Sequence, residues 1–150
     1  MLKHIKSFFV KESQSAESED DDTQDQVLAA AMLLIEVAWA DHEIEEREVQ
    51  TIRNALTDLY GIDNSEVEHV ISKAQETHES STGIYPFTTL LNEHLEHHEK
   101  RNLLEHLWRM NTFDSEFHYE EYMIRRIADL LYCTHEEFIV AKLSAKKRLT

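Results

Sequence analysis

Glycine and proline are almost missing from this chain of 150 residues, which has two glycines and one proline. Tight β-hairpin turns need glycine or a similar residue at positive φ, so a sheet would have few of the residues that its turns require. The periodic segments are filled instead with leucine, alanine, glutamate, lysine, arginine and glutamine, which have high helix propensity. We therefore expect an all-α fold that forms one domain with a buried core.

Basic residues are also scarce: 15 lysines and arginines stand against 30 acids, which gives a formal net charge of −15. Proteins that bind nucleic acid obtain much of their affinity from basic groups placed at phosphates. We therefore expect no nucleic-acid partner, whereas metal cations and basic protein surfaces remain compatible with the composition.

The single cysteine, Cys133, excludes an internal disulfide bond and is most simply a buried thiol, since it follows two leucines and a tyrosine. The chain shows no signal-peptide pattern with a cleavage site, and no apolar run approaches the ~20 residues of a membrane span. We expect a cytoplasmic protein.

Polarity divides the chain near residue 26. Within residues 1–11, apolar and basic side chains separate onto opposite sides, which is typical of a short basic amphipathic helix that packs on the domain or docks on a membrane or a partner. Residues 12–26 are rich in acids with little to bury, and we predict a mobile linker there. Residues 27–150 form the predicted helical domain.

Helical periodicity predicts about seven helices in this domain. The segment Val27–Ala40 is apolar nearly all round and should be the central buried helix, with Glu36 either at an exposed edge or paired with an arginine. Capping sequences predict where later helices begin; they are Asp41, Ser65 with Glu68, Pro86, and Thr134 with Glu137.

The sharpest functional motif directly follows the central helix, where Asp41, Glu43 and Glu48 border a turn between two helices. Hard cations such as Ca²⁺ and Mg²⁺ prefer several carboxylate and carbonyl oxygens, and this turn can supply them if Asp41 folds back. A regular EF-hand is excluded, because its loop would need glycine at Glu46 and glutamate at Ile52. The alternative is that these acids complement the helix dipole without a metal.

A degraded copy of the motif occurs later in the chain and predicts a duplicated helix–loop–helix unit. An alignment with one gap places Asp114 on Asp41, and Glu120 on Glu48, with Glu121 as the other possible match. The candidate metal ligands of the two copies are Asp41, Glu43, Glu48, Asp114, Glu116, Glu120 and Glu121.

A different candidate site is formed by His94 and His98, which lie on one face if a single helix carries both. Two imidazoles at this spacing suit Zn²⁺ or Ni²⁺, with Glu93 or His97 as a further ligand. Because the ten histidines are widely scattered, the alternative is a group of surface histidines at a helix junction.

Four segments taken in order carry a family resemblance: Ala38-x-Ala40-Asp41-x-Glu43-Ile44-x-x-x-Glu48, Tyr85-x-Phe87-Thr88, Leu104-x-x-Leu107-Trp108 and Ile124-Arg125-x-Ile127-Ala128-x-Leu130-Leu131. Over roughly Val27 to Ala145 the chain resembles the TerB-like (tellurite-resistance protein B-like) family. The resemblance implies a compact bundle of about seven helices without established catalysis, in which acids of two helix–loop–helix units hold a divalent metal. It also implies a setting in tellurite resistance, stress response or cytoplasmic and membrane-associated complexes, and a related domain occurs in some co-chaperones. The family usually has Ala-Asp-Gly, whereas His42 and Ser115 stand here in place of the conformationally free glycine.

These observations predict a non-enzymatic domain that binds a divalent cation, namely Ca²⁺, Mg²⁺, Mn²⁺ or Zn²⁺, and acts with an unidentified protein partner. The alternative is a metal-free interaction scaffold in which Arg53 pairs with Glu48 and Arg125 pairs with Glu120. In that case Arg53→Ala would destabilise the fold strongly, because it would leave a buried carboxylate without its partner.

Catalysis has little support in the sequence. Gly61 and Gly83 stand alone, which excludes a P-loop or a dinucleotide fingerprint. A third interpretation, a hydrolase that uses the carboxylates with His42 or His118, rests on no recognisable motif.

Overall fold

The computed structural model describes residues 19–41, 43–80, 83–111 and 119–148. These residues contain seven α-helices, one short 3₁₀ helix and no strand, which confirms the predicted all-α fold. The elements in chain order are α2 (Glu19–Ala38), η1 (Trp39–Asp41), α3 (Glu46–Tyr60), α4 (Asn64–Ser80), α5 (Tyr85–His94), α6 (His97–Trp108), α7 (Tyr119–Leu130) and α8 (His135–Arg148). The helix predicted in residues 1–11 lies outside the described residues.

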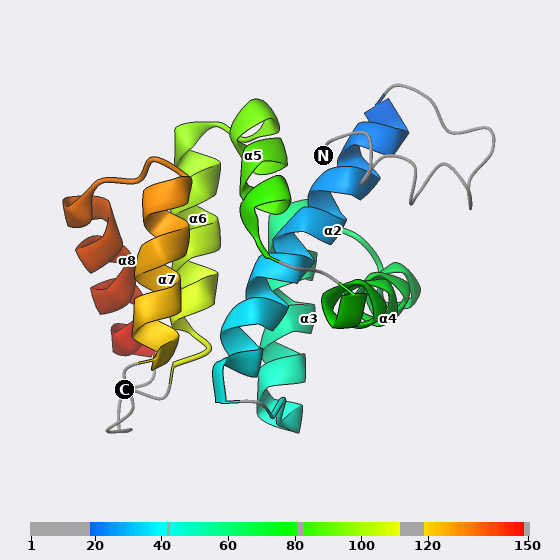
Figure 1. Ribbon diagram of the computed structural model, residues 1–150, viewed down its shortest axis with the longest axis horizontal. Helices are drawn as coiled ribbons and strands as arrows, with labels where there is room; N and C mark the ends of the chain where they lie inside the picture. Colours follow the sequence, from blue (N-terminus) through cyan, green and yellow to red (C-terminus); the bar gives the residue numbers. More distant parts are fainter. Residues whose placement is uncertain (1–18, 42, 81–82, 112–118, 149–150) are drawn as a thin grey trace.

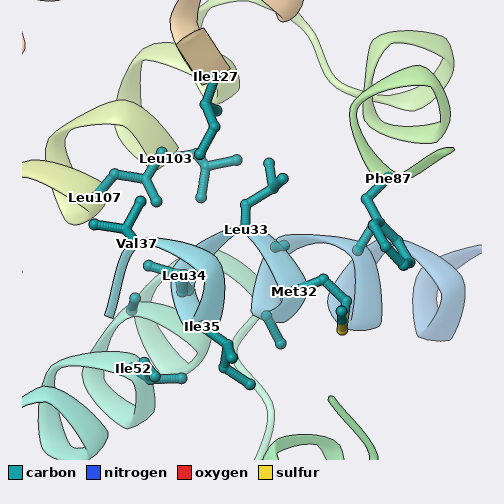
Figure 2. Close-up of a cluster of buried hydrophobic side chains, with 14 of the residues drawn as sticks. Met32, Leu33, Leu34, Ile35, Val37, Ile52, Phe87, Leu103, Leu107 and Ile127 are labelled. Carbon is teal, nitrogen blue, oxygen red and sulfur yellow. The ribbon is translucent and has the colours of Figure 1, made fainter. Parts of the chain in front are cut away.

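Helix α2 is the centre of the domain, as its apolar composition predicts. Every residue from Val27 to Ile35 is at most 3% exposed, because α3, α4, α5, α6 and α7 all pack against this helix. Figure 2 shows Ile52 of α3, Leu107 of α6 and Ile127 of α7 around the same turns of α2. A helix that is apolar on all sides requires neighbours on all sides, and this fold supplies them.

The remaining helices form two groups on either side of α2 (Figure 1). Helices α6, α7 and α8 pack together on one side, where the rings of Trp108 and Phe138 lie 5.1 Å apart between centroids. Glu105 of α6 joins the edge helix α8 to this group by accepting hydrogen bonds from Ser144 and Arg148. None of the described helices is long and apolar enough to cross a membrane.

Helix α2 begins at Glu19, within the segment that the sequence assigns to a linker. Acidic residues in a first helical turn are favourable because they face the positive end of the helix dipole. Farther along, Asp25 is buried, and the Tyr60 hydroxyl donates to the carbonyl of Gln26 at 3.4 Å. The acidic run is therefore partly a helix start and not only a linker.

Several predicted helix starts are confirmed and one is corrected. Thr134 and Glu137 cap α8 reciprocally, and Pro86 lies in the first turn of α5. At α4 the prediction of Ser65 as the cap is wrong, since Asp63 Oδ1 accepts hydrogen bonds both from the Glu66 N–H and from the Ser65 hydroxyl. Asp63 stands at the position from which its carboxylate can reach the first free N–H groups.

Candidate cation site

The first acidic motif and the described part of the second come from distant parts of the chain but lie at the same end of the molecule (Figure 1). Helix η1, which ends at Asp41, contacts α7, and the Arg47 side chain donates to the carbonyl of Met110 at 3.2 Å. Figure 1 shows the turn between η1 and α3 beside the lower ends of α6 and α7. The end of η1 and the start of α7 therefore lie at the same end of the molecule.

Glu48 is the best-defined acid of this region. Glu45, whose backbone is extended, is the N-cap of α3, and Glu48 Oε1 accepts a hydrogen bond from the Glu45 N–H at 2.9 Å in a reciprocal capping box. The prediction that Asp41 caps this helix is therefore wrong, because Asp41 ends η1 and Glu45 is the N-cap of α3. Glu48 is only 2% exposed, so its carboxylate lies inside the domain at the positive end of the α3 dipole.

Helical spacing explains why Glu48 turns inward whereas Glu43 does not. Glu48 lies four residues before the buried Ile52 and therefore shares its face of α3. Glu43 lies before the helix begins, outside any regular element, and is exposed.

In the second motif Glu120 has the same helical spacing from buried residues as Glu48 has, although Glu120 is half-buried and not buried. Glu120 lies four residues before Ile124 and seven before Ile127, both buried, so it occupies the inner face of α7. Glu121 instead faces α8, where its Oε1 accepts a hydrogen bond from Lys142 Nζ at 2.9 Å. Asp114 and Glu116 lie outside the described residues, so the predicted duplication of the unit stays a prediction.

Whether these acids form one metal site also stays a prediction. Within the part of the chain that the structure describes, no three His, Cys, Asp or Glu side chains lie close enough together to hold a metal ion. The described residues exclude the Asp41 side chain and residues 112–118, which carry three of the seven candidate ligands. The donors at this end are carboxylates, whose chemistry fits a hard divalent cation.

The predicted pairing of Arg53 with Glu48 is wrong. Arg53 Nε donates to Glu68 at 2.6 Å, and its Nη1 donates to Glu46 at 3.1 Å. Arg53 lies five positions after Glu48, which places their side chains ~140° apart around the helix. Hydrogen bonds to Glu68 and Glu46 raise the pKa of the Arg53 guanidinium above its ordinary value, and the group ties α3 to α4 at the surface.

Arg125 lies five positions after Glu120, the same spacing as between Arg53 and Glu48. The described contacts of Arg125 are with residues of α8. Its guanidinium lies over the ring of Phe138, 4.3 Å from the centroid, and its Nη1 is 3.3 Å from Nδ1 of His135.

The histidine site predicted at His94 and His98 is not formed as a helical pair. His94 ends α5 and His97 begins α6, with the backbone extended at Leu95 between them. His97 Nε2 instead lies 2.5 Å from a carboxylate oxygen of Glu137. This outcome favours the alternative of surface histidines at a helix junction.

Two pairs of a histidine with an acid from a distant helix were not predicted. His78 of α4 lies 2.9 Å from Glu36, the one acid of the apolar part of α2, so Glu36 pairs with a histidine and its expected pairing with an arginine is wrong. His106 is buried, and its Nε2 lies 2.8 Å from Asp58. Burial lowers the pKa of His106 below its ordinary value, although the hydrogen bond to Asp58 opposes this shift. Only the position of His106 beside Leu103 and Leu107 on the apolar face of α6 could have indicated its burial.

The described residues define a class, an all-helical domain with a central apolar helix and acidic residues in the first turns of α3 and α7. The family model for tellurite resistance protein TerB matches residues 27–143. The chain belongs to this family. No curated protein and no solved structure matches it.

Proposed function

We propose that this TerB-family domain is non-enzymatic and binds a divalent cation where the η1–α3 turn meets the start of α7. The observation that supports this proposal is the contact of η1 with α7, together with the hydrogen bond from Arg47 to the carbonyl of Met110. The two hydrogen-bonded residues are 63 positions apart in the chain, and in this proposal their contact places the first acidic motif near the second.

The proposed ligands come from both motifs. Asp41, Glu43 and Glu48 belong to the first, and Asp114, Glu116 and Glu120 belong to the second. Glu48 and Glu120 lie on the inner faces of their helices, whereas Glu121 faces Lys142 and is the weakest candidate. Carboxylate ligands favour Ca²⁺, Mg²⁺ or Mn²⁺ over Zn²⁺, which prefers nitrogen and sulfur donors.

The role of the cation in this proposal is structural. Carboxylates gathered at two helix starts repel one another unless they are protonated, paired with a base or bridged by a cation. A bound cation would hold the start of α3 against the start of α7 and would thereby fix the surface that a partner protein meets. Stress response and tellurite resistance are the settings that we propose for this activity.

The proposal is tested by thermal unfolding of chelator-stripped protein with and without Ca²⁺, Mg²⁺, Mn²⁺ and Zn²⁺. A cation that binds only the folded state stabilises it by about 2.7 kcal/mol at a hundred times its dissociation constant. We expect a rise in the unfolding midpoint that the double variant Asp41→Asn/Glu48→Gln loses. Glu66→Gln is the matched control, because Glu66 is an exposed acid in the first turn of α4.

A midpoint that no cation changes would refute the proposed cation site. The domain would then be a metal-free interaction scaffold, held at its surface by ion pairs such as the one between Arg53 and Glu68.

A further inference from the structure

Helix α8 has apolar side chains on two opposite sides. Phe138, Ala141 and Ala145 are buried on the side that packs against α6. Val140 and Leu143, in contrast, are 59% and 58% exposed. Because successive residues of a helix are ~100° apart, these two side chains project about 160° away from the buried side. A helix that is apolar on two sides usually has neighbours on both.

Among the described helices, α8 has neighbours on one side only. It packs on α6, and α7 reaches it through the hydrogen bond of Lys142 to Glu121 and through the guanidinium of Arg125 over the Phe138 ring. Figure 1 shows α8 at the edge of the domain, with α6 and α7 between it and α2. The outer side of α8 therefore lies on the surface of the molecule.

The outer side carries a regular pattern, which we call the α8 stripe. It consists of four exposed residues: Glu136, Val140, Leu143 and Lys147. Their spacing of four, three and four positions is that of the contact seam in a two-helix coiled coil. In order the stripe has an acid, two apolar residues and a base, so a second α8 that runs antiparallel is complementary to it. Val140 then lies against Leu143 of the second copy, and Glu136 against Lys147 of the second copy.

The charges at the two ends of α8 favour the same antiparallel arrangement. Its first turn carries the acids Glu136 and Glu137, and its last turn carries the bases Lys146, Lys147 and Arg148. In an antiparallel pair the acidic end of each helix lies beside the basic end of the other, and the two helix dipoles are opposed. Glu137 and Arg148 form ion pairs within their own copy, so the contact between copies involves Glu136 and Lys147. An exposed lysine exchanges its ion-pair partners at little cost.

We propose that this chain forms a weak homodimer in which the α8 stripes of two copies pack antiparallel about a two-fold axis. In such a contact every pair of residues occurs twice. The contact is short, because 14 helical residues extend over ~21 Å, and it buries less than the roughly 800 Å² per partner of a standard interface. Each copy also carries a net charge of −15, which opposes association. The dissociation constant should therefore be roughly 0.1 mM.

Sedimentation equilibrium of the full chain tests this dimer. The protein is measured from about 0.01 mM to about 0.5 mM, at about 0.15 M salt, where charges more than about 8 Å apart are largely screened. The weight-average mass should rise from 17.7 kDa toward twice that value. A chelator is present throughout and α8 carries none of the proposed cation ligands, so the result is independent of the proposed cation site.

The apolar part of the stripe is tested by Leu143→Glu. This change places a carboxylate in the centre of the contact, once from each copy, and the mass should stay at 17.7 kDa. Tyr85→Glu is the matched control, since Tyr85 of α5 is also 58% exposed, and it should associate like the unmodified chain. At about 5 µM, far below the expected dissociation constant, both variants should unfold at the midpoint of the unmodified chain, because surface changes cost little.

The antiparallel pairing is tested by exchanging charges. Glu136→Lys and Lys147→Glu each place like charges against one another at both ends of the contact, so each variant alone should associate at least about tenfold more weakly. An equimolar mixture of the two variants should regain the association of the unmodified chain. In the mixed dimer the two introduced charges face each other, and so do the two native ones.

Three results would overturn the proposal. The first is a mass of 17.7 kDa at every concentration, which would leave the α8 stripe to a different partner. The second is equal association of the unmodified chain and Leu143→Glu. The third is a mixture of Glu136→Lys and Lys147→Glu that associates no more strongly than either variant alone.

Discussion

Replacing either Leu33 or Leu34 of α2 by alanine should destabilise the domain by similarly large amounts. Both side chains are fully buried, and they project from α2 about 100° apart. In an ordinary amphipathic helix two adjacent positions seldom both face the core, but α2 has helices on every side.

The expected cost follows from this complete enclosure. Leucine-to-alanine substitutions at rigid core positions cost about 3–5 kcal/mol, because the cavity that remains adds to the lost burial. Alanine has the higher helix propensity, so the helix itself is not weakened. With a typical stability of about 5–15 kcal/mol, each variant should still fold but unfold at much lower denaturant concentration.

Urea unfolding followed by circular dichroism at the helical band measures this cost. Leu143→Ala is the matched control, since Leu143 is 58% exposed on α8 and its loss should cost no more than about 0.5 kcal/mol. If either Leu33→Ala or Leu34→Ala cost less than about 1 kcal/mol, α2 would have an open side and the description of the core would be wrong.

Three further substitutions test the caps and ion pairs. Thr134→Ala removes the hydroxyl that accepts a hydrogen bond from the Glu137 N–H, and urea unfolding should show a free energy of unfolding lower by about 1 kcal/mol. An unchanged urea midpoint would show that this cap does not stabilise α8. Arg53→Ala should shift the thermal midpoint by no more than about 2 °C, because the ion pairs of Arg53 are at the surface. A much larger fall in the midpoint would support the pairing of Arg53 with a buried carboxylate. Burial lowers the pKa of His106 below 6.5 in the folded state. As the pH falls through that value, the unfolded state therefore binds more protons than the folded state, and the free energy of unfolding declines. Unfolding free energies measured from about pH 7 to about pH 5 should therefore fall less in His106→Gln than in the unmodified chain, and parallel curves would contradict this.

Local sequence patterns predicted the helices because each helix is determined by neighbouring residues. The apolar segment that begins at Val27 identified the central helix, and Thr134 with Glu137 identified the start of α8. The true start of α2 at Glu19 was missed because an acidic first turn and an acidic linker have the same composition. The two are distinguished by tertiary contacts such as the hydrogen bond of Tyr60 to the Gln26 carbonyl.

The candidate cation site could be predicted only in part. Spacing alone indicates that Glu48 shares a face with Ile52, and the same rule applied to Arg53 shows that this arginine points elsewhere. The pairing of His78 with Glu36 joins residues 42 positions apart, and no local pattern could reveal it. The positive φ of Tyr132, in the turn between α7 and α8, likewise appears only once the turn is seen.

Isothermal titration calorimetry of the chelator-stripped protein tests the central claim, that the two acidic motifs meet in one cation site. Ca²⁺, Mg²⁺, Mn²⁺ and Zn²⁺ are titrated into the unmodified chain and into Glu48→Gln, Glu120→Gln and Glu121→Gln. We expect one binding event that both Glu48→Gln and Glu120→Gln weaken and that Glu121→Gln leaves intact, since Glu121 faces Lys142. No binding of any cation, or binding that neither Glu48→Gln nor Glu120→Gln alters, would contradict the claim.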